Sequence, residues 1–187
     1  MEQTKIISGN NEEVVWQQIT ADLKDDSILE YHVIIRQEER TVLLDIDIDP
    51  GGGFESGYEF TRLTSRILEK NDFRFALHHE DFMDKMGKLM GMEDVIIGYP
   101  EFDDKLIIKT NDPSKVKTVF SDKAVRELFQ SLTDFTIHIH HHVIDNEKGK
   151  EPFLELEIQR GVTNPIELRK IYHAFFSTLV ALDKTAY

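Results

Sequence analysis

Three histidines alternate along the segment 138–142, which reads His-Ile-His-His-His. In a β-strand successive side chains point to opposite faces, so His138, His140 and His142 would share one face, about 7 Å apart at each step. Imidazole nitrogens at positions i and i+2 can approach a zinc ion to about 2.1 Å. A carboxylate of a neighbouring strand could complete the site. We therefore consider a site for zinc or another divalent transition metal, formed by His138, His140, His142 and Asp47.

The same residues also have an interpretation that needs no metal. A row of histidines beside a row of acidic side chains would form a solvated, pH-sensitive sheet face. The acidic row Asp45, Asp47 and Asp49 spans about 13 Å on a strand, so these carboxylates alone cannot converge on one calcium or magnesium ion. The segment also fails the EF-hand pattern.

Other patterns give little support for catalysis. The chain has no cysteine, which excludes disulfides, thiolate nucleophiles and zinc sites with sulfur ligands. The stretch Pro50-Gly51-Gly52-Gly53 precedes a predicted helix but lacks the spacing of a phosphate-binding loop. His78 and His79 could act in acid–base chemistry, but no nucleophile is placed beside them and no Gly-x-Ser-x-Gly elbow is present. The sequence therefore favours a non-catalytic protein, without deciding the question.

Composition narrows the class of protein further. The 187 residues include 35 acidic and 22 basic side chains, and the net charge of −13 argues against binding of nucleic acids or anionic membranes. A hydrophobic content of 40% with 12 phenylalanines predicts a folded core, and the length suits a single domain over residues 1–187. The longest apolar stretch, 174–182, is shorter than the ~20 residues of a membrane span, and no signal peptide is visible. We expect a cytoplasmic protein.

Hydrophobic periodicity predicts an α+β fold with an antiparallel sheet and flanking helices. Helices are predicted from an Asn10 cap to Leu23, over 56–68 after a Ser56/Glu59 capping pair, over 121–132, and after Asn164. Strands are predicted at 31–36, 41–49, 135–144 and 153–159. Two units with the order helix, strand, strand, helix would result, at about 10–70 and 121–183, which suggests an internal pseudo-repeat.

The middle of the chain has a different pattern. It predicts a strand at 72–79, a helix at 80–91 with Met83, Met86 and Met90 on one stripe, and strands at 94–99 and 105–110. The segment 97–112, Ile-Gly-Tyr-Pro-Glu-Phe-Asp-Asp-Lys-Leu-Ile-Ile-Lys-Thr-Asn-Asp, resembles a motif of uncharacterised bacterial domains of unknown function. In that motif a G-x-x-x-F-D turn leads into an apolar strand and an N-D helix start. The resemblance implies a bacterial α+β protein and assigns no catalytic residue.

Three functions remain open at this point. The first is a non-catalytic domain that binds a protein partner or itself, through open hairpin edges and the aromatic side of the last helix, formed by Tyr172, Phe175 and Phe176. The second is a transition-metal-binding protein or metal-dependent enzyme that uses the histidine strand. The third is a small-molecule-binding domain with a phenylalanine-lined pocket between the sheet and the helices.

Overall fold

The computed structural model describes residues 4–24, 27–52, 56–68, 72–79, 92–143 and 150–185. The helix predicted at 80–91, with its methionine stripe, lies outside these residues. None of the described helices is both long enough and apolar enough to cross a membrane.

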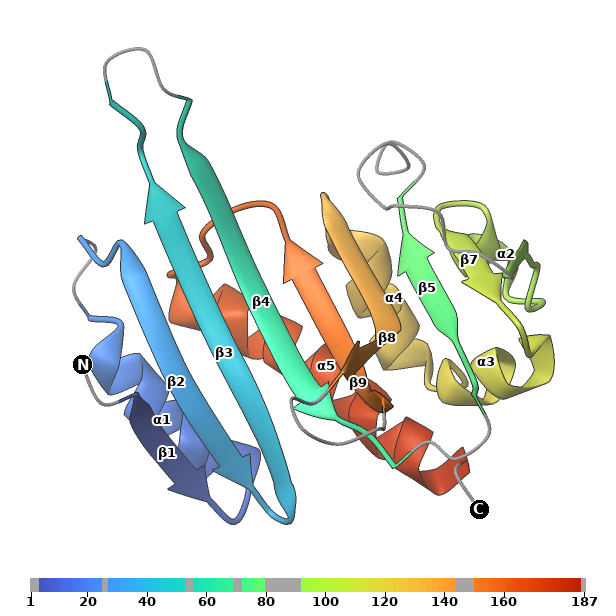
Figure 1. The fold of residues 1–187 in the computed structure, drawn as a ribbon, viewed down its shortest axis with the longest axis horizontal. Helices are drawn as coiled ribbons and strands as arrows, with labels where there is room; N and C mark the ends of the chain where they lie inside the picture. The colour runs from blue at the N-terminus through green and yellow to red at the C-terminus, as the bar shows by residue number, and fades with distance from the viewer. Residues whose placement is uncertain are drawn as a thin grey trace.

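A nine-stranded sheet forms the frame of the described structure (Figure 1). β1 is parallel to β2, and every other neighbouring pair is antiparallel. This arrangement confirms the predicted α+β class with a mostly antiparallel sheet. In spatial order the strands are β1 (Lys5–Gly9), β2 (Glu30–Gln37), β3 (Arg40–Asp49), β4 (Tyr58–Arg66), β9 (Lys150–Ile158), β8 (Phe135–Val143), β5 (Phe75–His78), β7 (Ile107–Thr110) and β6 (Glu93–Asp94).

Four helices lie on one face of this sheet in Figure 1, and none of the four covers the opposite face. They are α1 (Glu12–Asp22), α3 (Pro113–Val119), α4 (Lys123–Ser131) and α5 (Pro165–Thr185); a short helix, α2 (Pro100–Asp103), precedes β7. Side-chain caps begin three of these helices, at Asp112, at Asp122 and, as predicted, at Asn164. At α1 the cap is Asn11, one residue later than predicted.

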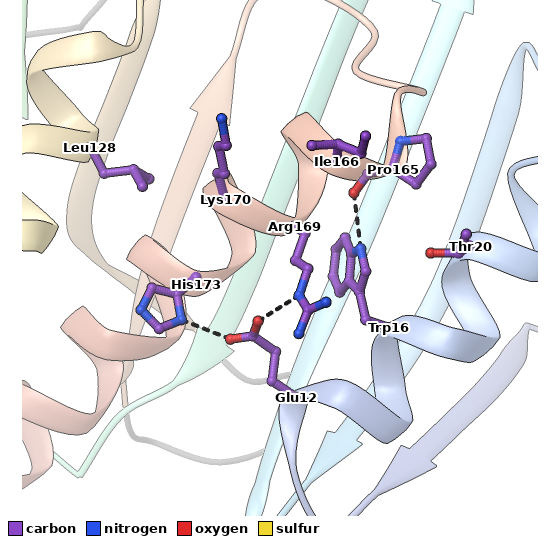
Figure 2. Close-up of a pocket in the computed structure, with 9 residues that line it drawn as sticks. All are labelled: Glu12, Trp16, Thr20, Leu128, Pro165, Ile166, Arg169, Lys170 and His173. Carbon is purple, nitrogen blue, oxygen red and sulfur yellow. Dashed lines mark hydrogen bonds and ion pairs between the residues drawn. The ribbon is translucent and has the colours of Figure 1, made fainter.

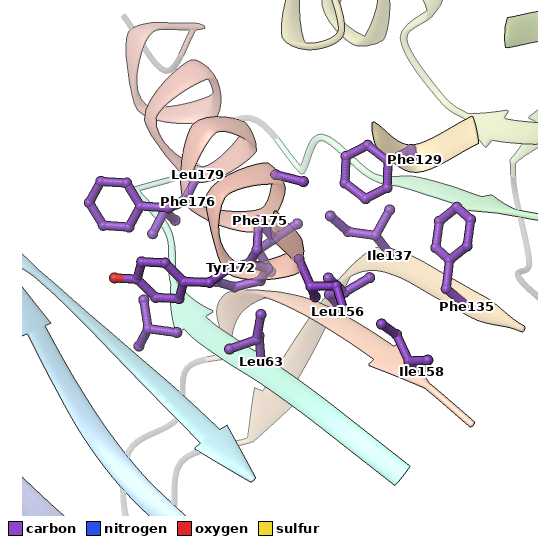
Figure 3. Close-up of a cluster of buried hydrophobic side chains, with 14 of the residues drawn as sticks. Leu63, Phe129, Phe135, Ile137, Leu156, Ile158, Tyr172, Phe175, Phe176 and Leu179 are labelled. Carbon is purple, nitrogen blue, oxygen red and sulfur yellow. The ribbon is translucent and has the colours of Figure 1, made fainter. Parts of the chain in front are cut away.

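The core lies between α5 and the central strands (Figure 3). Leu63 of β4, Leu156 of β9 and Ile137 of β8 are fully buried and face this helix layer. Tyr172, Phe175 and Phe176 of α5 pack into the same cluster and are at most 8% exposed. The prediction that these rings form an interaction surface is therefore wrong, because α5 runs along the sheet and turns its aromatic side inward.

Residues 56–68 do not form the helix that the Ser56/Glu59 pair predicts. Tyr58–Arg66 is β4, which pairs with β3 on one side and β9 on the other. The first predicted unit therefore has the order α1, β2, β3, β4, whereas the second has the predicted order α4, β8, β9, α5. β1 was not predicted, and the strand predicted at 94–99 is reduced to β6.

The G-x-x-x-F-D motif has a structural explanation. The Asp103 carboxylate accepts hydrogen bonds from the backbone N–H groups of Ile97 (3.0 Å), Gly98 (2.9 Å) and Tyr99 (2.8 Å). Gly98 adopts φ +84°, which favours glycine. Phe102 is fully buried. The motif therefore builds a turn and anchors it to the core.

Candidate metal site

His138 and His140 lie on the sheet face that the four helices leave uncovered. In β8 the apolar residues Phe135, Ile137 and Ile139 are buried toward the helices, and the alternation of a strand turns the histidines the other way. β9 is the antiparallel neighbour of β8, and Glu155 is the direct cross-strand partner of His138. Its side chain therefore lies on the same face as the two histidines.

One nitrogen from each of these two histidines and one carboxylate oxygen of Glu155 all lie within 4.8 Å of one another. Around a tetrahedral zinc ion with bonds of about 2.1 Å, ligand atoms are about 3.4 Å apart. Small rotations of the three side chains would bring the ligand atoms from within 4.8 Å of one another to the spacing that a zinc ion requires. The His138 and His140 ring centroids are 5.4 Å apart, so both rings already converge on one side of β8.

Neighbouring side chains orient the Glu155 carboxylate. Thr64 of β4 donates a hydrogen bond to Oε2 at 3.5 Å, and the Arg62 Nε atom lies 3.8 Å from the same oxygen. Both groups face Oε2. Arg62 is also held by Glu157, with a distance of 2.6 Å between its terminal nitrogen and Oε2. Such outer contacts commonly fix the geometry of metal ligands.

His138 is in an unusual electrostatic position. Its Nδ1 atom is buried and has no hydrogen-bond partner among the described residues. Burial lowers the pKa of His138, with a further lowering by Arg62 and an opposing effect of Glu157. The neutral imidazole that burial favours is the form that binds metals.

The structure brings together two of the four residues that the sequence analysis named as ligands. The backbone of His142 pairs with Glu151, but its side chain lies outside the described part of the structure. Asp47 pairs with Phe60, and its strand β3 is separated from β8 by β4 and β9, which corresponds to about 14 Å. Asp47 therefore does not reach the histidines, and Glu155 takes the place of the predicted carboxylate.

The other candidate residues make local contacts. His32 and Asp45 face each other across β2 and β3 with 3.0 Å between Nδ1 and Oδ1, a pairing that the sequence analysis did not predict. The ring nitrogens of His78 and His79 contact backbone oxygens of His79 and Leu132, at 2.8 and 2.7 Å. These contacts are structural and form no second cluster with His138.

Comparison of the chain with protein-family models and with curated proteins gives no match. The fold is that of an α+β protein with a mixed, mostly antiparallel sheet. Two imidazole nitrogens and one carboxylate oxygen can bind a divalent ion and leave a coordination position for water or another ligand.

Proposed function

We propose that the chain binds a divalent transition metal, with zinc as the first candidate, through His138, His140 and Glu155. The observation that supports this proposal is the convergence of three ligand atoms from two paired strands within 4.8 Å. Two of the ligands come from positions i and i+2 of one strand, so the backbone of β8 fixes their relative orientation.

The donor atoms favour some ions over others. Imidazole nitrogen suits zinc, copper, iron and nickel, whereas calcium and magnesium prefer an all-oxygen shell. The chain has no cysteine that could add a sulfur ligand. One carboxylate and two neutral imidazoles leave a bound divalent ion with a net positive charge, which the overall charge of −13 helps to stabilise.

Metal analysis of the untagged protein, purified without chelators and without nickel resin, tests this proposal. We expect about one zinc ion per chain, because three preorganised ligands are sufficient for a zinc site. His140→Ala and Glu155→Gln each remove one ligand and are expected to weaken zinc binding by at least about 100-fold. Equilibrium dialysis with zinc, followed by elemental analysis, measures both effects.

His32→Ala is the matched control for these variants. His32 lies on the same sheet face in β2, pairs with Asp45, and belongs to no cluster that could hold a metal among the described side chains. This variant should bind zinc as the wild type does. Unchanged zinc uptake in His140→Ala, with the fold intact by circular dichroism, would contradict the proposal.

A second candidate function is self-association, which one feature of the uncovered face supports. Ile6 of β1 pairs with Ile34 of β2, which pairs with Leu43 of β3, so an apolar row crosses three strands up to the free edge of β1. Ile6 is 49% and Leu43 is 40% exposed. Antiparallel pairing of β1 with β1 of a second copy would extend the sheet and continue this row.

Sedimentation at micromolar concentration tests self-association. We expect a dimer that Leu43→Lys dissociates, and one that tightens at higher salt, because screening reduces the repulsion between two copies of charge −13. Ile96→Lys is the control, since Ile96 is 82% exposed and follows β6 at the opposite end of the sheet. A monomeric wild type would rule out this candidate.

A further inference from the structure

A cavity of about 430 Å³ opens on the helix layer, between α1, α4 and the first half of α5. Figure 2 shows side chains of all three helices around it. Its volume is within the range of small-molecule sites, which is about 300–1,000 Å³. The cavity lies on the helices, whereas the histidine cluster lies on the uncovered sheet face, so the two sites are separate.

One wall of the cavity is apolar and fixed in place. It is formed by Trp16 of α1, Leu128 of α4, and Pro165 and Ile166 at the start of α5. The Trp16 indole N–H donates to the Pro165 carbonyl oxygen at 2.9 Å, and its ring lies 5.5 Å from that of Tyr172. Ile166 is 71% exposed and adds apolar surface beside the Trp16 wall.

Arg169 and His173 of α5 also line the cavity. The Arg169 Nε atom and the His173 Nδ1 atom hold the two oxygens of Glu12, at 2.9 and 2.7 Å. Burial raises the pKa of Glu12, but the contacts with Arg169 and His173 outweigh this effect and lower it overall. Glu12 therefore shows that a carboxylate is stabilised at this position.

Lys170 adds a second cationic residue to the lining, besides Arg169. Unlike Arg169, it makes no salt bridge with any residue in the described part of the chain, and it is exposed. In Figure 2 its ammonium group extends from α5 between Leu128 and Ile166, away from Glu12. An anionic group placed there would meet Lys170 while an attached apolar body covered Trp16 and Ile166.

We propose that this cavity binds a small amphipathic carboxylate, with its apolar body on Trp16, Leu128 and Ile166 and its carboxylate on Lys170. The positive charge of Lys170 lies beside the apolar wall of the cavity, just as the carboxylate of such a ligand lies beside its apolar body. This proposal does not depend on metal binding.

Octanoate is the probe, and the protein reports its binding directly, because Trp16 is the only tryptophan of the chain. Titration with octanoate should give a saturable change in tryptophan emission, because the alkyl chain would pack against the 4% of the Trp16 side chain that is exposed and change the surroundings of the indole. Octan-1-ol, which has the same alkyl chain without the charge, should bind about tenfold more weakly. Calorimetry of the same samples also detects binding that leaves the emission unchanged.

Two substitutions should act in opposite directions. Lys170→Met keeps the apolar length of the side chain and is expected to weaken octanoate binding about tenfold without changing octan-1-ol binding. Glu12→Gln removes the negative charge beside the cavity and is expected to strengthen octanoate binding a few-fold. Lys184→Met is the control, since Lys184 lies in the last turn of α5, outside the cavity.

Three results would overturn the proposal. They are the absence of saturable octanoate binding up to millimolar concentration by both methods, equal affinities for octanoate and octan-1-ol, and unchanged octanoate affinity in Lys170→Met. Weaker binding by folded Glu12→Gln would also contradict the electrostatic argument. Circular dichroism of each variant confirms that its fold is intact.

Discussion

Replacement of Phe175 by alanine is expected to lower the free energy of unfolding by about 3–5 kcal/mol. The Phe175 ring is fully buried in the cluster between α5 and the sheet (Figure 3). Its removal loses the transfer free energy of the ring and leaves a cavity that rigid strands on one side cannot fill. For a chain of this length the melting temperature should fall by roughly 6–20 °C.

Urea unfolding followed by far-UV circular dichroism measures this loss. Ile166→Ala is the matched control on the same helix, because a 71% exposed side chain should contribute about 0.5 kcal/mol or less. A loss below about 1 kcal/mol for Phe175→Ala would mean that α5 does not pack on the sheet as described.

The parts of the fold that the sequence predicts are those in which one face is clearly apolar. β2, β3, β8 and β9 alternate strongly, and α5 repeats large apolar residues at helical spacing after an asparagine cap. These signals are local, so they can be read without knowing the partner of each segment. The hairpin of β8 and β9 and the helices on either side of it follow from such signals alone.

β4 shows why other elements escape prediction. Phe60, Leu63 and Ile67 follow a helical spacing, and the inward positions next to Leu63 in the strand, Thr61 and Ser65, are polar. Tertiary hydrogen bonds make these polar positions acceptable. The Thr61 hydroxyl donates to the Arg160 carbonyl at 2.9 Å, and the Ser65 hydroxyl donates to the Thr41 carbonyl at 2.8 Å. Contacts with segments distant in sequence therefore outweigh the local pattern.

The position of β4 also explains why Asp47 lies apart from the histidines. The histidine row could be predicted from its period of two, but the third ligand depends on which strand lies beside β8 and in which register. β4 lies between β3 and β9 and thereby separates Asp47 from the histidines. The register of β8 with β9 places Glu155 opposite His138, and although the hairpin itself can be predicted, its exact register is not visible in a single sequence.

Substitution of His138 by leucine is expected to stabilise the metal-free protein and to abolish its response to zinc. The buried Nδ1 atom of His138 lacks a hydrogen-bond partner among the described residues. A buried polar atom without a partner costs about 1–3 kcal/mol, and leucine fills a similar volume without this cost. We therefore expect the free energy of unfolding of the metal-free variant to rise by about 1–2 kcal/mol.

Zinc is expected to reverse the order of stability between the wild type and His138→Leu. A ligand that binds only the folded state at 1,000 times its dissociation constant contributes about 4 kcal/mol. The wild type should gain this amount, whereas His138→Leu has lost a ligand and should gain almost nothing. Urea unfolding of the wild type and of His138→Leu, each with excess zinc and with a chelator, measures the four free energies of unfolding. His32→Leu controls for the general effect of leucine on this sheet face.

Each outcome has a definite interpretation. A metal-free variant that is more stable but does not respond to zinc would mean that His138 is retained at a cost to stability because it binds an ion, as is typical of functional sites. A variant less stable than the wild type, together with an unchanged response to zinc, would show that His138 contributes to packing and that the metal-site proposal is wrong. The response to zinc therefore shows whether His138 binds an ion, and the sign of the change in the metal-free protein shows whether its imidazole costs stability.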